Sequence, residues 1–390
     1  INCIEENDNI SNNPTIMTLD SAVTTPHTLA MTMEEGIAAA KLFEQAGCDS
    51  MHLRLGPLGH HVAQFGADLY FILNGIEGCT GFGTQYDFSK NWQGMLIGNT
   101  SGCGIGLNVA AEYKKALSIP CGVVTYNDPA HAPDFFEQAL EDGKADFFLM
   151  TRPLTVDMEY VNKLKEGRID EIAPCTRCLH CHIGSNEANA QMAYCRVNAL
   201  TQRVMREGGP ATYELEPAAT PKKVMVIGGG PAGMEAARIA AARGHNVTLY
   251  EKRGALGFML DFAASVKGPH ENLADLKNYL IRQLELNGVE VKTGTEVTQE
   301  LINSEAPDAV ILAAGGLEMD NFMFTEMGDN VIVYGSNAQA FDAALWLTVH
   351  KKNVTIVTPN PASEFDMQQS QHAMRMMTTA LYALGVKSYP

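Results

Sequence analysis

The sequence predicts an α/β protein built from parallel sheets, and three features of the chain lead to that prediction. Strand-like and helix-like segments alternate before residue 173, and the same alternation returns after Pro221. The second alternation opens on a glycine-rich turn, and four clustered cysteines lie between the two regions. Short connections between alternating strands and helices favour a parallel sheet. At 390 residues the chain is long enough for two or three domains.

The first region supplies the elements of the first sheet. Its predicted helices span 32–47, 109–117 and 132–142, and its predicted strands span 50–55, 121–125 and 145–150. Between His61 and Ser101 the pattern changes to glycine-rich and aromatic sequence. A loop of this length inside a compact domain is usually functional, so we expect it to cover a substrate. A surface excursion is the alternative.

Charge and composition narrow the class of protein. The chain carries 45 acidic and 28 basic residues, a net charge of −17, which disfavours binding of nucleic acid. No apolar run approaches the roughly 20 residues that a transmembrane helix needs. The chain opens without a basic and apolar leader, so no secretory signal is expected. We therefore expect a cytoplasmic protein that binds neither nucleic acid nor membrane.

Four cysteines form the chemical centre of the sequence. Cys175, Cys178, Cys181 and Cys195 are spaced as three plus one, whereas the other five cysteines are scattered over the first third of the chain. A tight loop can present three thiolates while a later residue provides the fourth. Structural zinc sites more often pair two and two, so the spacing favours an iron–sulfur cluster, with zinc as the alternative. His180 and His182 flank the array and are not needed as ligands.

A dinucleotide-binding motif follows the cysteines. An apolar strand leads into Gly228-x-Gly230-x-x-Gly233 and a helix start, and the strand over 246–250 ends at Glu251. The glycines allow a tight turn, approach of a pyrophosphate and close packing of helix on strand, while the acid suits ribose hydroxyls. We also include Ala232 and Val297 among the cofactor-binding candidates.

A weaker copy of the motif lies further along the chain. Strands are predicted over 330–334 and 354–358, and Gly335 and Asn337 occupy the turn after the first of them. Asn337 replaces a glycine, and Thr358 stands where an acid would select the ribose. We expect a nicotinamide-binding subdomain here, with a fold element that has lost its ligand as the alternative; NADH and NADPH both remain open.

The ordered motifs resemble one branch of the old yellow enzyme superfamily. The cysteine spacing, the preceding Arg152-Pro-Leu and 163–175 segments and the following flavin fingerprint are similar to 2,4-dienoyl-CoA reductase and 2-enoate reductase. Trimethylamine dehydrogenase shares that architecture. The resemblance covers nearly the whole chain and implies an FMN-bearing (β/α)8 barrel, a 4Fe-4S segment on the four cysteines and a Rossmann-like FAD domain with an inserted NAD(P)H domain.

The resemblance also implies domain boundaries. A full barrel takes about 250 residues, so the first region represents only the C-terminal half, and we expect further sequence before Ile1 and after Pro390. The expected parts are the half-barrel at 1–173, the cluster segment at 174–200, a linker at 201–220, an incomplete FAD-binding domain at 221–316 and the NAD(P)H-binding subdomain at 317–390.

Two further groups of residues take roles from the resemblance. The FMN phosphate is assigned to the last two barrel loops, through Thr125, Asn127, Thr151 and Arg152. A structural arginine that caps a helix or forms a salt bridge is the alternative for Arg152. His60 or His61 follows the predicted strand at 50–55 and would stabilise charge on a substrate oxygen, with a structural histidine as the alternative.

Together these features predict NAD(P)H-dependent reduction of an activated C=C bond in an enoate, enoyl-CoA or enone. Electrons would pass from FAD to the 4Fe-4S cluster, then to FMN and to a small unsaturated substrate. The alternatives are an amine dehydrogenase resembling trimethylamine dehydrogenase and a non-catalytic, zinc-stabilised scaffold. A homo-oligomer is possible, and the proton donor is expected in sequence before Ile1.

Overall fold

The computed structural model describes most of the elements that the sequence predicts. The described residues are 2–3, 33–55, 104, 106–124, 127–178, 180–181, 195–201, 215–267, 272–315, 328–359, 381 and 384–389. The chain divides into two units. Unit 1 comprises residues 1–156, 177–196 and 325–390, and unit 2 comprises residues 157–176 and 197–324.

Unit 1 contains a four-stranded parallel sheet in the order β1-β2-β3-β4. Its strands are β1 (Asn2–Cys3), β2 (Met51–Leu55), β3 (Cys121–Val124) and β4 (Phe147–Leu149). The helices of this region are α2 (Met33–Gln45), α5 (Leu107–Ala116), α6 (Pro133–Glu141) and the short α7 (Arg152–Val156). The strands β2, β3 and β4 and the helices α2, α5 and α6 agree with the predicted ones to within about two residues at each end, the usual uncertainty of such boundaries. The sequence did not predict β1 or α7.

Helix α6 shows how the local sequence sets these elements. It begins with Pro133, whose fixed φ suits the first helical turn, and it is followed by Gly143 in the left-handed conformation at φ +68°. Its Phe136 is buried and packs edge-on against Phe148 of β4, with ring centroids 4.9 Å apart. The helix thus covers β4 through one aromatic contact.

Unit 1 also contains a three-stranded parallel sheet in the order β11-β10-β9. The strands are β9 (Asn330–Tyr334), β10 (Asn353–Val357) and β11 (Lys387–Tyr389), and helix α14 (Ala338–Val349) packs against β9 and β10. Phe341, Ala344 and Leu345 form the buried side of α14. The strand–turn–helix order of the weaker glycine motif is therefore present.

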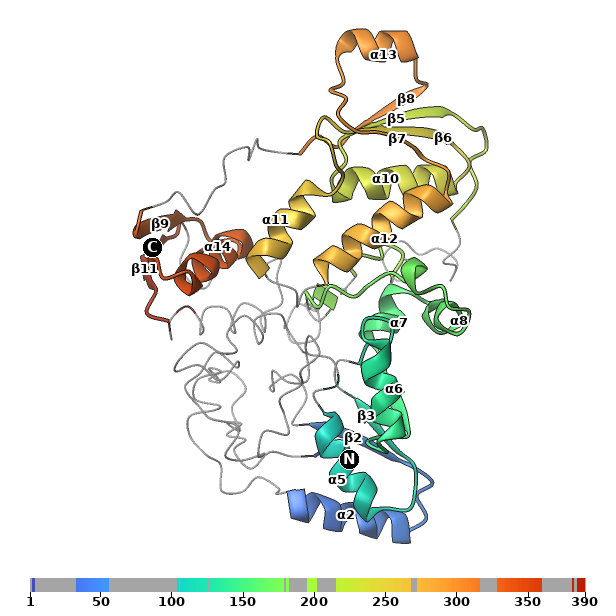
Figure 1. Cartoon of the computed structure of the whole chain (residues 1–390), viewed down its shortest axis with the longest axis vertical. Helices are drawn as coiled ribbons and strands as arrows, with labels where there is room; N and C mark the ends of the chain where they lie inside the picture. Colours follow the sequence, from blue (N-terminus) through green and yellow to red (C-terminus); the bar gives the residue numbers. More distant parts are fainter. Residues whose placement is uncertain are drawn as a thin grey trace. The chain divides into compact units, whose positions relative to one another are not determined.

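Unit 2 is built on the parallel sheet β7-β6-β5-β8. Its strands are β5 (Lys223–Ile227), β6 (Asn246–Tyr250), β7 (Glu290–Lys292) and β8 (Ala309–Leu312). Its helices are α8 (Tyr160–Lys165), α10 (Pro231–Ala242), α11 (Phe258–Lys267), α12 (Leu273–Leu286) and α13 (Gln299–Glu305), with a 3-10 turn at Ile169–Glu171. Figure 1 shows α10 and α12 below this sheet and α13 above it.

The core of unit 2 lies between the sheet and helices α10 and α12. Val226 and Leu249 from the strands meet Met234 of α10 and Leu284 of α12, and all four side chains are buried. This packing fixes α12 to the strand–turn–helix unit that carries the glycine motif. The predicted parallel α/β architecture is confirmed.

Further predictions from the sequence concern membrane-spanning helices, the glycine-rich segment and the domain boundaries. Among the described residues, no helix has the length and apolar character needed to span a membrane. The glycine-rich segment between His61 and Ser101 lies outside the described residues, as do His60 and His61. The predicted domain boundaries stay predictions.

Replacing Phe136 with Ala should lower the free energy of unfolding by about 3–5 kcal/mol, because the substitution leaves a cavity between α6 and β4. Leu140→Ala is the matched control on the same helix, since Leu140 is 38% exposed. Its effect should stay within about 0.5 kcal/mol. Chemical denaturation measures both, and equal losses would contradict the described packing of α6.

Candidate functional site

The turn between β5 and α10 is held by two glycines that the fold itself requires. Gly228 has φ +110°, and a methyl group added to it would lie 2.3 Å from the carbonyl oxygen of Ala313. A methyl group on Gly233 would lie 1.8 Å from the carbonyl oxygen of Gly228. Both positions therefore exclude a side chain because backbone atoms occupy the space.

Gly230 differs from these two glycines because the space around it is open. A methyl group placed on Gly230 meets no atom within 4 Å, and the residue directly precedes α10. The first N–H groups of a helix have no partner within the helix and attract anions. Gly230 is thus the position of the motif where a phosphate could approach the backbone, and the neighbouring Ala232 is exposed.

Glu251 lies beside the same turn, at the end of β6. One carboxylate oxygen accepts a hydrogen bond from the Gly229 N–H at 2.6 Å, and the other accepts from the Arg253 N–H at 2.9 Å. Each carboxylate oxygen can accept two hydrogen bonds, so acceptor capacity remains for ribose hydroxyls. The acid therefore shapes the glycine turn as well as standing where a ribose would bind. Val297, in the connection between β7 and α13, is half-buried.

The weaker motif is organised around an ordinary helix cap. The Asn337 side-chain oxygen accepts a hydrogen bond from the Ala340 N–H at 3.0 Å and so caps α14. Gly335 has φ +148°, and Thr358 after β10 is buried. The cap uses one of the two lone pairs of the Asn337 oxygen, so the second lone pair and the amide nitrogen could still bond to a ligand.

Asn127 joins the ends of two strands of the first sheet in unit 1. Its amide nitrogen donates to the carbonyl oxygens of Val123 and Leu149, at 2.9 and 3.3 Å. The side chain is 1% exposed, and its Oδ1 has no hydrogen-bond partner among the described residues. Both donors are thus committed to strand carbonyls, so the side chain can offer a ligand only an acceptor, which suits a hydroxyl better than a phosphate.

The other predicted phosphate contacts are placed as follows. Arg152 begins α7 and is buried, while Thr151 is exposed and its carbonyl oxygen accepts a hydrogen bond from the Thr155 hydroxyl at 2.8 Å. Thr125 lies outside the described residues. A role for these residues at FMN stays a prediction.

Three of the four predicted cluster cysteines lie in unit 1 and influence one another. Burial raises the pKa of the Cys181 thiol to about 11, the Arg152 guanidinium opposes that rise, and Cys178 and Cys195 add to it. In the described part of the chain, no three or more histidine, cysteine, aspartate or glutamate side chains are placed to hold a metal ion. His180 is buried, and His182 lies outside the described residues.

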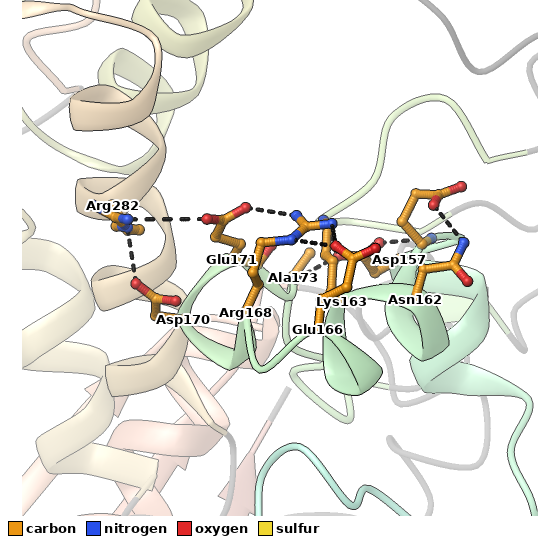
Figure 2. A network of polar contacts seen from close by, with 10 residues as sticks. Asp157, Asn162, Lys163, Glu166, Arg168, Asp170, Glu171, Ala173 and Arg282 are labelled. Atoms are coloured by element: carbon orange, nitrogen blue, oxygen red, sulfur yellow. Dashed lines mark hydrogen bonds and ion pairs between the residues drawn. The ribbon is translucent and has the colours of Figure 1, made fainter.

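Cys175, the first cysteine, lies in unit 2 and is buried. The segment before it is fixed by Asp157, which accepts hydrogen bonds from Lys163 Nζ at 2.7 Å and from the Ala173 N–H at 2.9 Å. Figure 2 shows the same segment reaching Arg282 of α12 through two carboxylates. Asp170 lies 2.9 Å and Glu171 3.9 Å from the guanidinium of Arg282.

Comparisons with known proteins extend over most of the chain. A family profile described as pyridine nucleotide-disulphide oxidoreductase matches residues 203–320. The NADH oxidase of Thermoanaerobacter brockii is 32% identical over 367 residues, covering 87% of this chain and 50% of the relative. The cinnamate reductase of Clostridium sporogenes is 34% identical over 348 residues, covering 83% of this chain and 44% of the relative.

The fold of the chain is similar to that of a solved structure of 2-naphthoyl-CoA reductase with 2-naphthoyl-CoA. Its TM-score is 0.72 at 26% identity, and the match covers 100% of this chain and 52% of that one. These relatives confirm the resemblance to the 2,4-dienoyl-CoA reductase and old yellow enzyme branch. The chain spans about half the length of the members of this branch that it matches.

Sequence reasoning missed the residues that hold the cysteine segment in place. Asp157 and Arg282 are unremarkable charged residues in the sequence, and the contacts to α12 join positions more than a hundred residues apart. No local spacing or composition marks such a pairing. Only the resemblance to the reductase branch pointed to residues 163–175.

In this chain we expect the open side of Gly230 to be needed for the cofactor, and the closed sides of Gly228 and Gly233 for the fold. Gly230→Val should lower the bound flavin content while leaving the thermal unfolding of the flavin-free protein unchanged, because the added side chain meets no protein atom close to its Cβ. Gly233→Ala should lower the unfolding temperature of unit 2, because its methyl group collides with backbone. Flavin absorbance and calorimetry measure the two effects. Normal flavin content in Gly230→Val would contradict the assignment.

Proposed function

We propose that this chain is part of an NAD(P)H-dependent reductase of activated C=C bonds, acting on an enoate, an enoyl-CoA or an enone. The observation that carries the proposal is the turn between β5 and α10, where an open glycine, a helix start and Glu251 converge. That arrangement suits the pyrophosphate and ribose of FAD. The relatives named cinnamate reductase and 2-naphthoyl-CoA reductase support the substrate class.

The residues of unit 2 fit FAD at the first glycine motif. A side chain at Gly230 would fill the open space through which a pyrophosphate would approach, and Glu251 keeps acceptor capacity for a ribose that carries no phosphate. A carboxylate would repel a 2′-phosphate, so the acid favours FAD over a phosphorylated nucleotide. NADH or NADPH is assigned to the weaker motif around Gly335 and Asn337.

The donor chemistry of the cysteine segment fits a 4Fe-4S cluster. Cys175, Cys178, Cys181 and Cys195 supply four thiols in a three-plus-one spacing. Structural zinc sites more often pair two and two, whereas a run of three closely spaced cysteines with a fourth further along is typical of iron–sulfur proteins. The spacing therefore supports a cluster over zinc.

The end of the first sheet offers partial support for FMN. Asn127 has a buried oxygen with unused acceptor capacity, which fits a ribityl hydroxyl, and the buried Arg152 provides a cation. Arg152 also stabilises the Cys181 thiolate, so its charge would serve both the cluster and the flavin phosphate. We assign His60 or His61 to the substrate oxygen, where a donor would stabilise developing negative charge.

When bound, the flavins and the cluster supply hydride transfer and single-electron transfer. The chain supplies position and charge. Gly230 and the start of α10 receive the pyrophosphate, Glu251 orients the ribose, and Asp157 holds the segment that leads to Cys175. An electron path through these groups requires fixed distances, which the rigid attachment of that segment to unit 2 would provide.

The acceptor is the discriminating test of this proposal. Protein reduced anaerobically with dithionite should be reoxidised by cinnamate-type enoates, enoyl-CoA thioesters or enones, with recovery of flavin absorbance. Reoxidation of flavin by none of these acceptors, together with flavin reduction by a tertiary amine, would contradict the proposal and favour an amine dehydrogenase. A colourless protein containing stoichiometric zinc would favour the scaffold.

A further inference from the structure

Asn272, directly before α12, makes a buried contact with the first cysteine of the cluster segment. Its amide nitrogen donates a hydrogen bond to the carbonyl oxygen of Cys175 at 3.1 Å. Asn272 is 2% exposed, and the two residues lie 97 positions apart in the sequence. Both belong to unit 2. The contact therefore ties the backbone of the first cysteine to the nucleotide-binding unit.

The conformation of Asn272 is not that of an ordinary helix cap. Thr298 and Asn337 cap their helices from extended backbone at ψ 168°, and each side chain accepts a hydrogen bond from the helix. Asn272 instead has φ +50° and ψ +28°, a left-handed conformation, and makes no side-chain capping bond. This conformation is uncommon in residues other than glycine, and asparagine adopts it where local contacts favour it. The bond to Cys175 is a contact of that kind.

A second contact lies further along the same helix. Arg282 pairs with Asp170 and Glu171, whereas Asn272 holds Cys175 (Figure 2 shows the Arg282 end). Ten residues of α-helix separate the two attachment points by about 15 Å. Attachment at two separated points prevents the segment from pivoting on α12. Since α12 packs against α10, the backbone of Cys175 is held in a fixed place relative to the glycine turn.

We infer that Asn272 is a positioning residue for Cys175 as a cluster ligand. This inference rests on the proposed function and adds to it the group that holds the first ligand. The hydrogen bond fixes the peptide plane that follows Cys175 and with it the direction in which the chain continues toward Cys178. Groups that orient a metal ligand without touching the metal typically change affinity 10–100-fold when they are removed.

The test compares two Asn→Asp substitutions, one at each end of α12. Asn272→Asp keeps the size of the side chain and its tolerance of left-handed backbone, but places an acceptor against the Cys175 carbonyl oxygen. Asn287→Asp is the control, because Asn287 at the other end of α12 donates to the Gln283 carbonyl oxygen at 2.8 Å and does not contact the cysteine segment. The probe is loss of iron from the full chain to ferrozine, followed by absorbance.

Asn272→Asp should lose iron about tenfold faster than wild type, while Asn287→Asp loses it at the wild-type rate. Asn272→Gly retains the left-handed backbone and lacks the amide, so it should also lose iron faster with an unchanged unfolding temperature. If Asn272→Asp fails to fold, Asn272→Gly still tests the inference. Equal rates in wild type and Asn272→Gly would overturn this inference alone. Absence of iron from wild type would overturn the cluster assignment of the proposed function, and this inference with it.

Discussion

The close approach of α10 to β5 is the constraint on which the nucleotide-binding unit depends. The carbonyl oxygen of Gly228 occupies the space that a side chain on Gly233 would take, so strand and helix can meet only through glycine. This approach places the start of α10 and the Glu251 carboxylate around one turn. The same packing seats α12 on α10, and α12 carries the contacts to the cysteine segment. The glycine turn and the attachment of Cys175 to α12 therefore depend on one backbone contact.

Polar contacts around α12 hold the segment that leads to Cys175, the first cysteine, within unit 2. Asp157 is buried, so its charge is stable only because Lys163 and two backbone N–H groups satisfy it. Removing one partner of such a group leaves a buried charge uncompensated. Because breaking these contacts is costly, the arrangement is rigid. The ion pairs of Arg168 and Arg282 contribute less because these two side chains are only partly buried and water screens their charges. The buried groups make the segment rigid, and the ion pairs of Arg282 determine where the segment meets α12.

Much of the fold follows from the sequence, and the reasons are local. The strands at 246–250 and 330–334 are observed as β6 and β9 with the predicted ends, because short apolar runs between turn residues specify strands strongly. The glycine motif was recognised because each glycine has a physical task. The tasks differ, however, and only the three-dimensional structure distinguishes them. At Gly228 and Gly233 nearby backbone atoms leave no room for a side chain, whereas the space beside Gly230 is open.

The remaining parts of the site could not be predicted because they depend on contacts between distant segments. The bond from Asn272 to Cys175 and the use of both Asn127 donors by strand carbonyls leave no mark in local sequence. The resemblance placed Asn127 at a phosphate by position, and its hydrogen bonds now favour a hydroxyl. The cluster ligands Cys175, Cys178, Cys181 and Cys195, the FMN contacts and His60 or His61 remain proposals.

The proposed function requires an electron path from the nucleotide-binding unit to an iron–sulfur cluster on the four cysteines. The sharpest test is anaerobic reduction of the full chain, loaded with flavin and cluster, by NADH or NADPH, followed by electron paramagnetic resonance. We expect about four irons and four acid-labile sulfides per chain and the signal of a reduced 4Fe-4S cluster after the nicotinamide is added. Stoichiometric zinc without iron, or a cluster that dithionite reduces and neither nicotinamide does, would contradict the proposed function.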